Sequence, residues 1–314
     1  MRSPIAVVGA GLVGAGWAIV FARSGHSVRI YDHDKEVMVS VLRDIHSNLA
    51  DLQSCGLIDD ADVVAGRMEV CDSLELAIDG VSYVQESVYE TVSTKKEILQ
   101  QLDEVCGLDT VIGSSSSGIP ASAFTESIKC RERCLIAHPV NPPYLVPIVE
   151  LVPAPWTDHA AIEFTYALME SVGQSPVRIN REVDGFVLNR LQGALLNEAW
   201  ALFEEGYASV EDIDKTVAEG LGLRWSFMGP FQTIDLNAPK GVKDYAARLS
   251  SLYHSVAKSR TKPEPWSEDL VNRVEQERRL HFSLEELSGR RKWRDRRLMA
   301  LVAHKTKVKV KMGD

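Results

Sequence analysis

The chain has 314 residues, of which 45% are hydrophobic and 25% are charged, and its formal net charge is −9. This length allows two domains with a sizeable core, and the composition is that of a globular protein rather than a disordered one. The negative charge argues against general affinity for nucleic acid or for an anionic membrane surface. We therefore expect a small-molecule partner.

The first residues and the cysteines indicate the compartment in which we expect the protein. Its first apolar run is too short for a membrane span of roughly 20 residues and has no positive region before it, so we expect a cytoplasmic protein. The five cysteines are odd in number, and none stand at CxxC spacing. This usage favours reduced, packed thiols over a disulfide framework or a metal site.

The first predicted element is a buried strand over residues 5–8, followed by a glycine turn and a helix. Gly9 permits the tight turn, Gly11 lets the backbone approach a pyrophosphate, and Gly14 allows close packing of the helix on the strand. The helix N-terminus offers free N–H groups and the positive end of its macrodipole to the phosphates. Alone, this spacing could be only a glycine-rich turn. With its flanking elements it predicts a dinucleotide site at Gly9, Gly11, Leu12, Val13 and Gly14.

An acid at the end of the next strand selects the cofactor. The apolar run 28–31 ends at Asp32, which lies 18 residues after Gly14. That distance suits a carboxylate that binds a ribose 2′-hydroxyl and repels a 2′-phosphate, so NAD is favoured over NADP. Arg29 lies on the opposite face of the strand from Ile30 and is not expected to contact a 2′-phosphate.

The following elements alternate between helix and strand. Residues 35–54 have apolar positions at helical spacing, which predicts a long amphipathic helix. Strand-like runs then occur at 83–86, 110–113, 134–137, 146–152 and 176–179. The alternation predicts an α/β fold with a Rossmann-type, doubly wound and mostly parallel sheet.

Near Asp184 the pattern changes to helices. They are predicted over 186–205, over 210–220, through the 230s and 240s, and over 268–279, with a proline-containing loop at 261–266. We therefore expect an NAD-binding domain over 1–184 and an all-α substrate and dimerisation domain over 185–314. Residues 305–311 alternate lysine with valine, which predicts an edge strand or, more commonly, a frayed and solvated tail.

A histidine follows one of the predicted strands. His138 stands in the loop after residues 134–137, where ligands of an open α/β sheet gather. Imidazole can remove a hydroxyl proton near neutral pH, and Glu150 could orient it and stabilise the imidazolium. The alternative for His138 is a loop histidine satisfied by backbone carbonyls.

Five motifs give the chain a resemblance to a known family over nearly its whole length. They are Gly9–Gly14, Ser114–Ser117, His138–Pro142, Val149–Val152 and Gly185–Arg190. In this order they resemble the 3-hydroxyacyl-CoA dehydrogenase superfamily. Within it, residues 138–144, 219–225 and 291–295 look most like the lambda-crystallin branch, whose enzymatic identity is L-gulonate 3-dehydrogenase.

The resemblance implies catalytic roles for four residues. His138 would be the general base and Glu150 its partner, while Ser117 and Asn189 would hold the substrate oxygen or the imidazole. A helix cap is the alternative for Ser117, and a satisfied polar residue in a core helix is the alternative for Asn189.

The resemblance also implies further cofactor contacts. Glu90 and Lys95 would contact the ribose and nicotinamide side of the cofactor, and Asn141 would lie near the nicotinamide. Ser117 would also contact the cofactor. The alternative for Glu90 and Lys95 is a surface pair at a charged helix start.

The substrate is less well defined by the sequence. Arg224 is the candidate for binding a substrate carboxylate, because arginine can do so bidentately, and its alternative is a surface charge at a helix end. Polar neighbours at 226, 232 and 237 suit a polyol acid such as L-gulonate better than a fatty chain. L-carnitine dehydrogenase or short-chain 3-hydroxyacyl-CoA dehydrogenase activity remains an alternative, as does a non-catalytic, NAD-binding structural protein. The family likeness also implies a homodimer.

Overall fold

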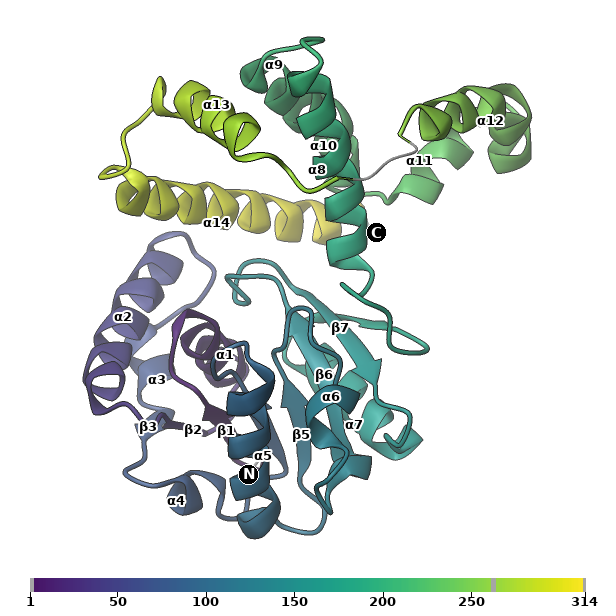
Figure 1. Ribbon diagram of the computed structural model, residues 1–314. Coiled ribbons are helices and arrows are strands. Elements are labelled where there is room, and N and C mark those ends of the chain that lie inside the picture. The colour runs from purple at the N-terminus through teal and green to yellow at the C-terminus, as the bar shows by residue number, and fades with distance from the viewer. Residues whose placement is uncertain (1–2, 261–263, 313–314) are drawn as a thin grey trace. The chain divides into compact units, whose positions relative to one another are not determined.

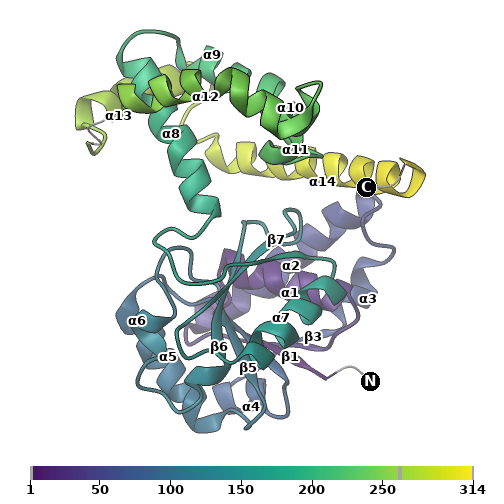
Figure 2. The ribbon, with the colours of Figure 1, turned by 90° about the vertical axis from the view of Figure 1, so that its right-hand side faces the viewer.

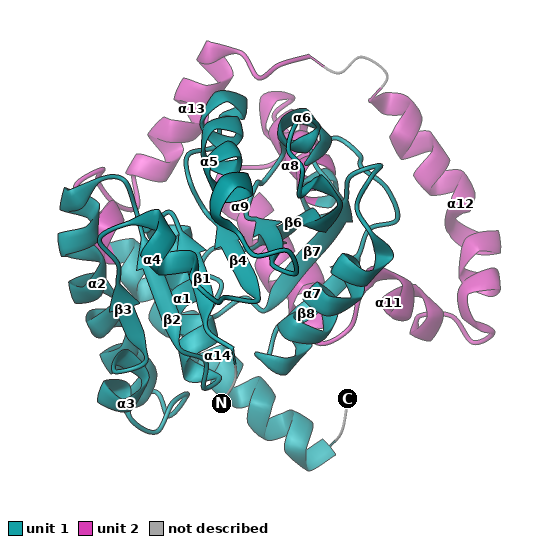
Figure 3. Cartoon of the chain, turned by 90° about the horizontal axis from the view of Figure 1, so that it is seen from below, with its two compact units in different colours: residues 1–191, 290–314 teal, residues 192–289 magenta. Residues whose placement is uncertain are grey.

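The computed structural model describes residues 3–260 and 264–312. Residue contacts divide the chain into two units, which Figure 3 shows in different colours. Unit 1 contains residues 1–191 and 290–314, and unit 2 contains residues 192–289. The chain therefore leaves unit 1 once and returns to it with its last helix.

Unit 1 is built on an eight-stranded sheet in the order β3-β2-β1-β4-β5-β6-β7-β8. The strands are β1 (Ile5–Val8), β2 (Val28–Tyr31), β3 (Met68–Val70), β4 (Tyr83–Glu86), β5 (Val111–Ser114), β6 (Cys134–Pro139), β7 (Ile148–Pro153) and β8 (Ser175–Arg178). Among the strand pairs of the described residues, only β6–β7 is antiparallel. Strand order reverses between β1 and β4, and ligands of such sheets bind at the carboxyl ends beside this reversal. The predicted Rossmann-type fold is confirmed.

Helices cover both faces of the sheet (Figures 1 and 2). On one face lie α1 (Leu12–Arg23), α2 (Lys35–Ser54), α3 (Ala61–Ala65) and α7 (His159–Ser171), and on the other α4 (Leu74–Ile78), α5 (Val92–Val105) and α6 (Ser122–Thr125). A short 3₁₀ turn, η1 (Arg131–Arg133), leads into β6. Because strand side chains alternate, Ile5 and Val7 join one apolar cluster and Ala6 and Val8 the other.

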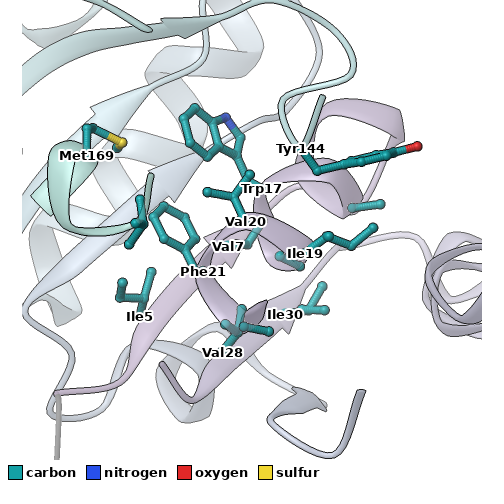
Figure 4. Close-up of a cluster of buried hydrophobic side chains, with 14 of the residues drawn as sticks. Ile5, Val7, Trp17, Ile19, Val20, Phe21, Val28, Ile30, Tyr144 and Met169 are labelled. Carbon is teal, nitrogen blue, oxygen red and sulfur yellow. The ribbon is translucent and has the colours of Figure 1, made fainter. Parts of the chain in front are cut away.

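Helix α1 is nearly enclosed by the first of these clusters. Figure 4 shows Trp17 and Phe21 of this helix beside Ile5 and Val7 of the first strand. The two aromatic rings stack with centroids 5.4 Å apart, and both side chains are fully buried. A helix that packs this closely fixes the glycine turn before it relative to the sheet.

Most of the predicted elements of unit 1 are confirmed, and α2 has the predicted bounds. The short elements β3, α3 and α4 were missed, because segments of three to five residues hold too little periodicity to detect. One boundary matters for the site. Strand β6 continues to Pro139, since its antiparallel pairing with β7 extends to the Pro139–Val149 pair. His138 is therefore part of the strand, and the expectation that it lies in the following loop is wrong.

The described residues of unit 2 contain helices and no strand. The helices are α8 (Leu188–Glu204), which begins in unit 1, α9 (Val210–Lys215), the π-helix η2 (Thr216–Leu221), α10 (Gly222–Trp225), α11 (Pro230–Leu236), α12 (Gly241–Ser259) and α13 (Glu268–Arg279). The predicted all-α character is confirmed. Arg260, after α12, binds Glu198 and Glu205 of the α8 segment at 2.6–3.1 Å. Of the predicted loop, residues 261–263 lie outside the described residues.

The last helix corrects the expectation for the end of the chain. Residues Leu287–Met312 form α14, so the predicted edge strand or frayed tail at 305–311 is wrong. Leu298, Met299 and Val302 stand at helical spacing, and the first two pack in the core cluster of unit 1. The lysines of the tail lie in the last turns of α14, where positive charges interact favourably with the negative end of the helix macrodipole. Residues 290–314 group with unit 1 by their contacts, while the domain bounds of 1–184 and 185–314 stay a prediction.

This docking of α14 predicts the effect of shortening Met299, which is 1% exposed. Met299→Ala should lower the free energy of unfolding by about 2–5 kcal/mol, because it leaves a cavity in the core. Urea unfolding measures the change, and Met312→Ala, at a position 78% exposed, is the control. If the two variants lost equal stability, α14 would not pack on unit 1 as described.

The described helices include none that is long and apolar enough to cross a membrane.

Candidate active site

A histidine and a glutamate face each other across the antiparallel strands. His138 of β6 and Glu150 of β7 are directly paired in the ladder, so their side chains lie on the same side of the sheet. His138 Nδ1 and Glu150 Oε2 are 2.9 Å apart, and both side chains are buried. The pairing that extends β6 therefore creates this contact.

The second carboxylate oxygen of Glu150 accepts two backbone hydrogen bonds. The N–H groups of Val187 and Leu188 donate to Oε1 at 2.9 and 2.8 Å. These groups are aimed by a turn in which Gly185 and Phe186 have φ values of +73° and +51°. A left-handed conformation is uncommon for phenylalanine and requires support from its surroundings.

These contacts set the protonation of the pair. Burial by itself would raise the pKa of Glu150, but the hydrogen bonds from His138, Leu188 and Val187, and the electrostatic attraction of His138, hold that pKa below its usual value. An ionised carboxylate only accepts hydrogen bonds, so Nδ1 of His138 must carry a proton. The neutral ring then has its lone pair at Nε2, where it can act as a base.

Phe186 was not recognised as part of the site from the sequence. Its side chain is fully buried, and its ring centroid lies 5.7 Å from that of His138. It thereby packs against the imidazole while its backbone directs Val187 and Leu188 to Glu150. The only signal in the sequence is the glycine before it, which marks a turn but not a positive φ at residue 186.

Ser117 and Asn189 are brought together by the fold. The side-chain amide of Asn189 donates to the Ser117 carbonyl at 2.6 Å. Helix α6 begins at Ser122, with Ala121 at its N-cap, so the interpretation of Ser117 as a helix cap is wrong. Asn189 directly follows Leu188. The turn that holds Glu150 is therefore joined to the loop after β5 that contains residues 115–118, which we call the serine loop.

Glu90 and Lys95 are also linked to this loop. Glu90 Oε1 accepts from the backbone N–H of Ser117 at 2.8 Å, and its Oε2 lies 3.3 Å from Lys95 Nζ. The Lys95 side chain is only 1% exposed, so the surface-pair interpretation is wrong. Its ammonium also donates to both oxygens of Glu86, a buried residue that sequence reasoning missed. Direct contact between Lys95 and the cofactor stays a prediction.

The glycine turn leaves no room for side chains at two of its positions. A Cβ at Gly14 would lie 1.8 Å from the Gly9 carbonyl oxygen, and one at Gly9, where φ is +98°, would lie 2.5 Å from the backbone of Ser87. At Gly11, by contrast, no described atom comes within 4 Å of an added Cβ. The backbone is thus exposed where a pyrophosphate would approach, at the start of the 12-residue helix α1.

Asp32 lies beside this turn and lines a cavity of about 340 Å³ at the ends of β1, β2 and β4. Its Oδ2 accepts from the Ala10 N–H at 2.8 Å and its Oδ1 from the Asp34 N–H at 2.9 Å. A carboxylate has about four acceptor positions, so ribose hydroxyls can still bind. The guanidinium of Arg29 donates instead to the carbonyls of Leu76 and Asp79, away from this cavity, as predicted. These residues fit the adenosine and pyrophosphate of NAD.

Two candidates have fewer described contacts. Asn141 is exposed two residues after β6 ends, and it precedes the cis peptide bond to Pro142. Arg224 is exposed on α10 in unit 2, whereas the geometry above belongs to unit 1. Their roles remain predictions. In the described part of the chain, no group of three or more His, Cys, Asp or Glu residues is placed to hold a metal ion.

Comparison with known families matches both parts of the chain. The model of the 3-hydroxyacyl-CoA dehydrogenase NAD-binding domain matches residues 4–183, and the model of the C-terminal domain of the same enzymes matches residues 185–280. The junction between the two matches falls at residue 184.

Individual proteins are similar over most of their length. Lambda-crystallin of Oryctolagus cuniculus is 39% identical over 98% of this chain and 99% of its own. L-carnitine dehydrogenase of Streptomyces griseus is 37% identical over 76% of this chain and 70% of its own. A solved 5-formyl-3-hydroxy-2-methylpyridine 4-carboxylic acid 5-dehydrogenase, described as an NAD⁺-dependent dismutase, has a TM-score of 0.81 with 27% identity and covers 96% of this chain and 97% of its own.

Proposed function

The chain belongs to the 3-hydroxyacyl-CoA dehydrogenase family, and from this premise we propose that it oxidises a small 3-hydroxy acid, L-gulonate foremost, with His138 as the general base. It is an NAD-dependent oxidoreductase of the hydroxy-acid type. The observation that carries the proposal is the buried contact between His138 Nδ1 and Glu150 Oε2, which leaves Nε2 as a base.

Each residue of the site has its own role in the oxidation of the alcohol. NAD, when bound, supplies the acceptor for the hydride that leaves the carbinol carbon. His138 Nε2 takes the hydroxyl proton, and Glu150 stabilises the imidazolium that forms. Asn189 and Ser117, joined by their hydrogen bond, hold the substrate oxygen in reach of the imidazole. A 3-hydroxy acid would thereby become a 3-keto acid.

L-Gulonate is favoured by the full-length similarity to lambda-crystallin and by the polar residues at 226, 232 and 237 that follow Arg224 in the sequence. Arg224 would bind the substrate carboxylate bidentately. The similarity to L-carnitine dehydrogenase supports a second candidate, L-carnitine, whose quaternary ammonium would call for an aromatic cage. A purely structural role is disfavoured, because such a protein has no chemical reason to keep both His138 and Glu150.

We further propose that the protein is a cytoplasmic homodimer that pairs through unit 2. Several large apolar side chains of its longest helix, α12, are exposed, namely Val242, Leu252, Tyr253 and Val256. Sedimentation of the full chain would test the oligomeric state.

Turnover with three substrates tests the proposed reaction. NADH formation is followed with L-gulonate, L-carnitine and (S)-3-hydroxybutyryl-CoA in the same NAD buffer. We expect strong turnover of L-gulonate alone. Turnover of another substrate would contradict L-gulonate as the substrate but would leave His138 as the proposed general base. Absence of turnover with all three substrates would favour a binding or structural protein.

The cofactor preference is tested at Asp32. Asp32→Ala should weaken NAD binding by about 10- to 100-fold, because it removes charge-assisted hydrogen bonds to ribose, while NADP binding weakens less or improves. Isothermal titration with each cofactor measures the ratio, with the exposed Asp72→Ala as control. An unchanged preference for NAD would contradict this role.

A further inference from the structure

Three charged side chains meet next to the serine loop: Glu86 at the end of β4 and Lys95 in the first turn of α5 are buried, and Glu90 is partly exposed. Lys95 Nζ lies 3.1 Å from both oxygens of Glu86 and 3.3 Å from Glu90 Oε2. An ammonium has three donors, so the geometry assigns two to Glu86 and one to Glu90. Side-chain exposure is 0–1% for Glu86 and Lys95 but 39% for Glu90.

Glu86 is fully occupied at this position. Its Oε1 also accepts from the Val88 N–H at 2.7 Å, and its Oε2 also accepts from the Ser114 hydroxyl. With Lys95 on both oxygens, every acceptor position has a partner. A buried carboxylate that accepts hydrogen bonds at every position in this way holds the Lys95 side chain in a fixed place.

Glu90 links Lys95 to the serine loop. With Oε2 on Lys95, its Oε1 accepts from the Ser117 and Gly118 N–H groups at 2.8 and 3.3 Å, and from the Ser116 hydroxyl at 2.7 Å. Burial would raise the pKa of Glu90, but the Lys95 charge and the bonds from residues 116–118 keep that pKa below its usual value. The loop is therefore bound to an anion whose counter-ion is Lys95.

The same loop is joined to the base. The Ser117 carbonyl accepts from Asn189, and the preceding residue, Leu188, donates its N–H to Glu150. A continuous series of hydrogen bonds and chain neighbours thus runs from Glu86 through Lys95, Glu90, Ser117 and Asn189 to the Glu150–His138 pair.

We propose that Glu86 is a positioning residue, which acts through Lys95 and Glu90 to hold Ser117 and Asn189 in register with His138. This inference rests on the proposed dehydrogenase reaction. If Glu86 is made neutral, the Lys95 ammonium has one anionic partner left and is drawn to Glu90, and the bonds of Glu90 to residues 117 and 118 are disturbed.

The test compares Glu86→Gln with Glu86→Gln/Lys95→Met. Glu86→Gln should lower kcat about tenfold or more, because small displacements in a site slow the reaction strongly. The double variant removes both buried charges, and apolar replacement of a buried pair often restores stability. We therefore expect the double variant to recover Tm but not kcat, since Glu90 has lost its counter-ion. Glu104→Gln, an exposed change of the same charge on α5, is the control.

Three readouts separate positioning from a structural role and from a wrong reaction. Tm reports the fold, NAD titration reports the cofactor site without any substrate, and kcat is measured with whichever of the three substrates the wild type turns over. Recovery of kcat together with Tm in the double variant would overturn the proposal, as would a kcat for Glu86→Gln equal to that of Glu104→Gln. Absence of wild-type turnover together with normal NAD binding would instead contradict the proposed reaction, and with it the role of Glu86.

Discussion

His138→Asn should lower kcat by about 10²- to 10⁴-fold while leaving NAD affinity nearly unchanged. Asparagine has no group that can take a proton near neutral pH, so the reaction loses its general base. The amide can still occupy the space between Phe186 and Glu150, and the glycine turn that binds the cofactor is untouched. Steady-state kinetics with whichever of the three substrates the wild type turns over, together with NAD titration, measures the two effects.

The control for this variant is His159→Asn. His159 begins α7, and its side chain is 84% exposed, so the same change of residue type is made outside the site. We expect kcat close to wild type. If His138→Asn retained more than about a tenth of wild-type kcat, general-base catalysis by this residue, worth at least about 10²-fold, would be excluded.

The parts of the site that could be predicted are those fixed by short segments of sequence. Gly9, Gly14 and Asp32 belong to one βαβ unit, where each residue type is required by a local turn or by the end of a strand. The structure shows the packing that requires these glycines, because side chains at Gly9 and Gly14 would collide with backbone. Local sequence is sufficient for such a motif, because its geometry depends on few long-range contacts.

The burial of Lys95 illustrates a signal that was present but not used. Lys95, Leu99 and Leu102 stand at i, i+4 and i+7 on α5, and all three are buried. This spacing places the lysine on the apolar face of the helix. A buried lysine needs an anionic partner, and Glu86, at the end of a buried strand, is within nine positions in the sequence. Pattern alone could therefore have predicted the ion pair, though not its link to Ser117.

Other features depend on contacts that no local pattern contains. The His138–Glu150 contact requires one register of an antiparallel pair, in a sheet whose other neighbours are parallel. The alternation of lysine and valine over 305–311 has a period of two and does not reveal that these residues continue a helix, whose apolar positions Leu298, Met299 and Val302 lie before them. Leu298 and Met299 pack in the core cluster of unit 1, and this tertiary packing stabilises the helix.

Glu150→Gln should lower kcat by about 10³- to 10⁴-fold by reversing the tautomer of His138. The glutamine oxygen can keep the two backbone bonds from Val187 and Leu188, which leaves its NH₂ group facing Nδ1. That group donates a hydrogen bond, so Nδ1 must become the acceptor and the ring proton moves to Nε2. The nitrogen that should take the substrate proton is then already protonated.

The same substitution has a distinct effect on stability. Because the folded state lowers the pKa of Glu150 from its ordinary value of 4.5, the ionised carboxylate stabilises the fold above that pH. This contribution disappears as the pH falls through the lower folded-state pKa. Glu150→Gln should therefore lower Tm at neutral pH, and the difference from wild type should narrow below pH 4.5.

Kinetics and thermal unfolding over pH test both effects, with Glu170→Gln, an exposed change on α7, as control. A loss of Tm without a loss of kcat would make Glu150 a structural residue only. If Glu150→Gln lowered kcat no more than Glu170→Gln does, a reversed tautomer of His138 would be excluded. Equal Tm differences at neutral and acidic pH would show that the carboxylate charge, held by His138 and two backbone N–H groups, does not stabilise the fold.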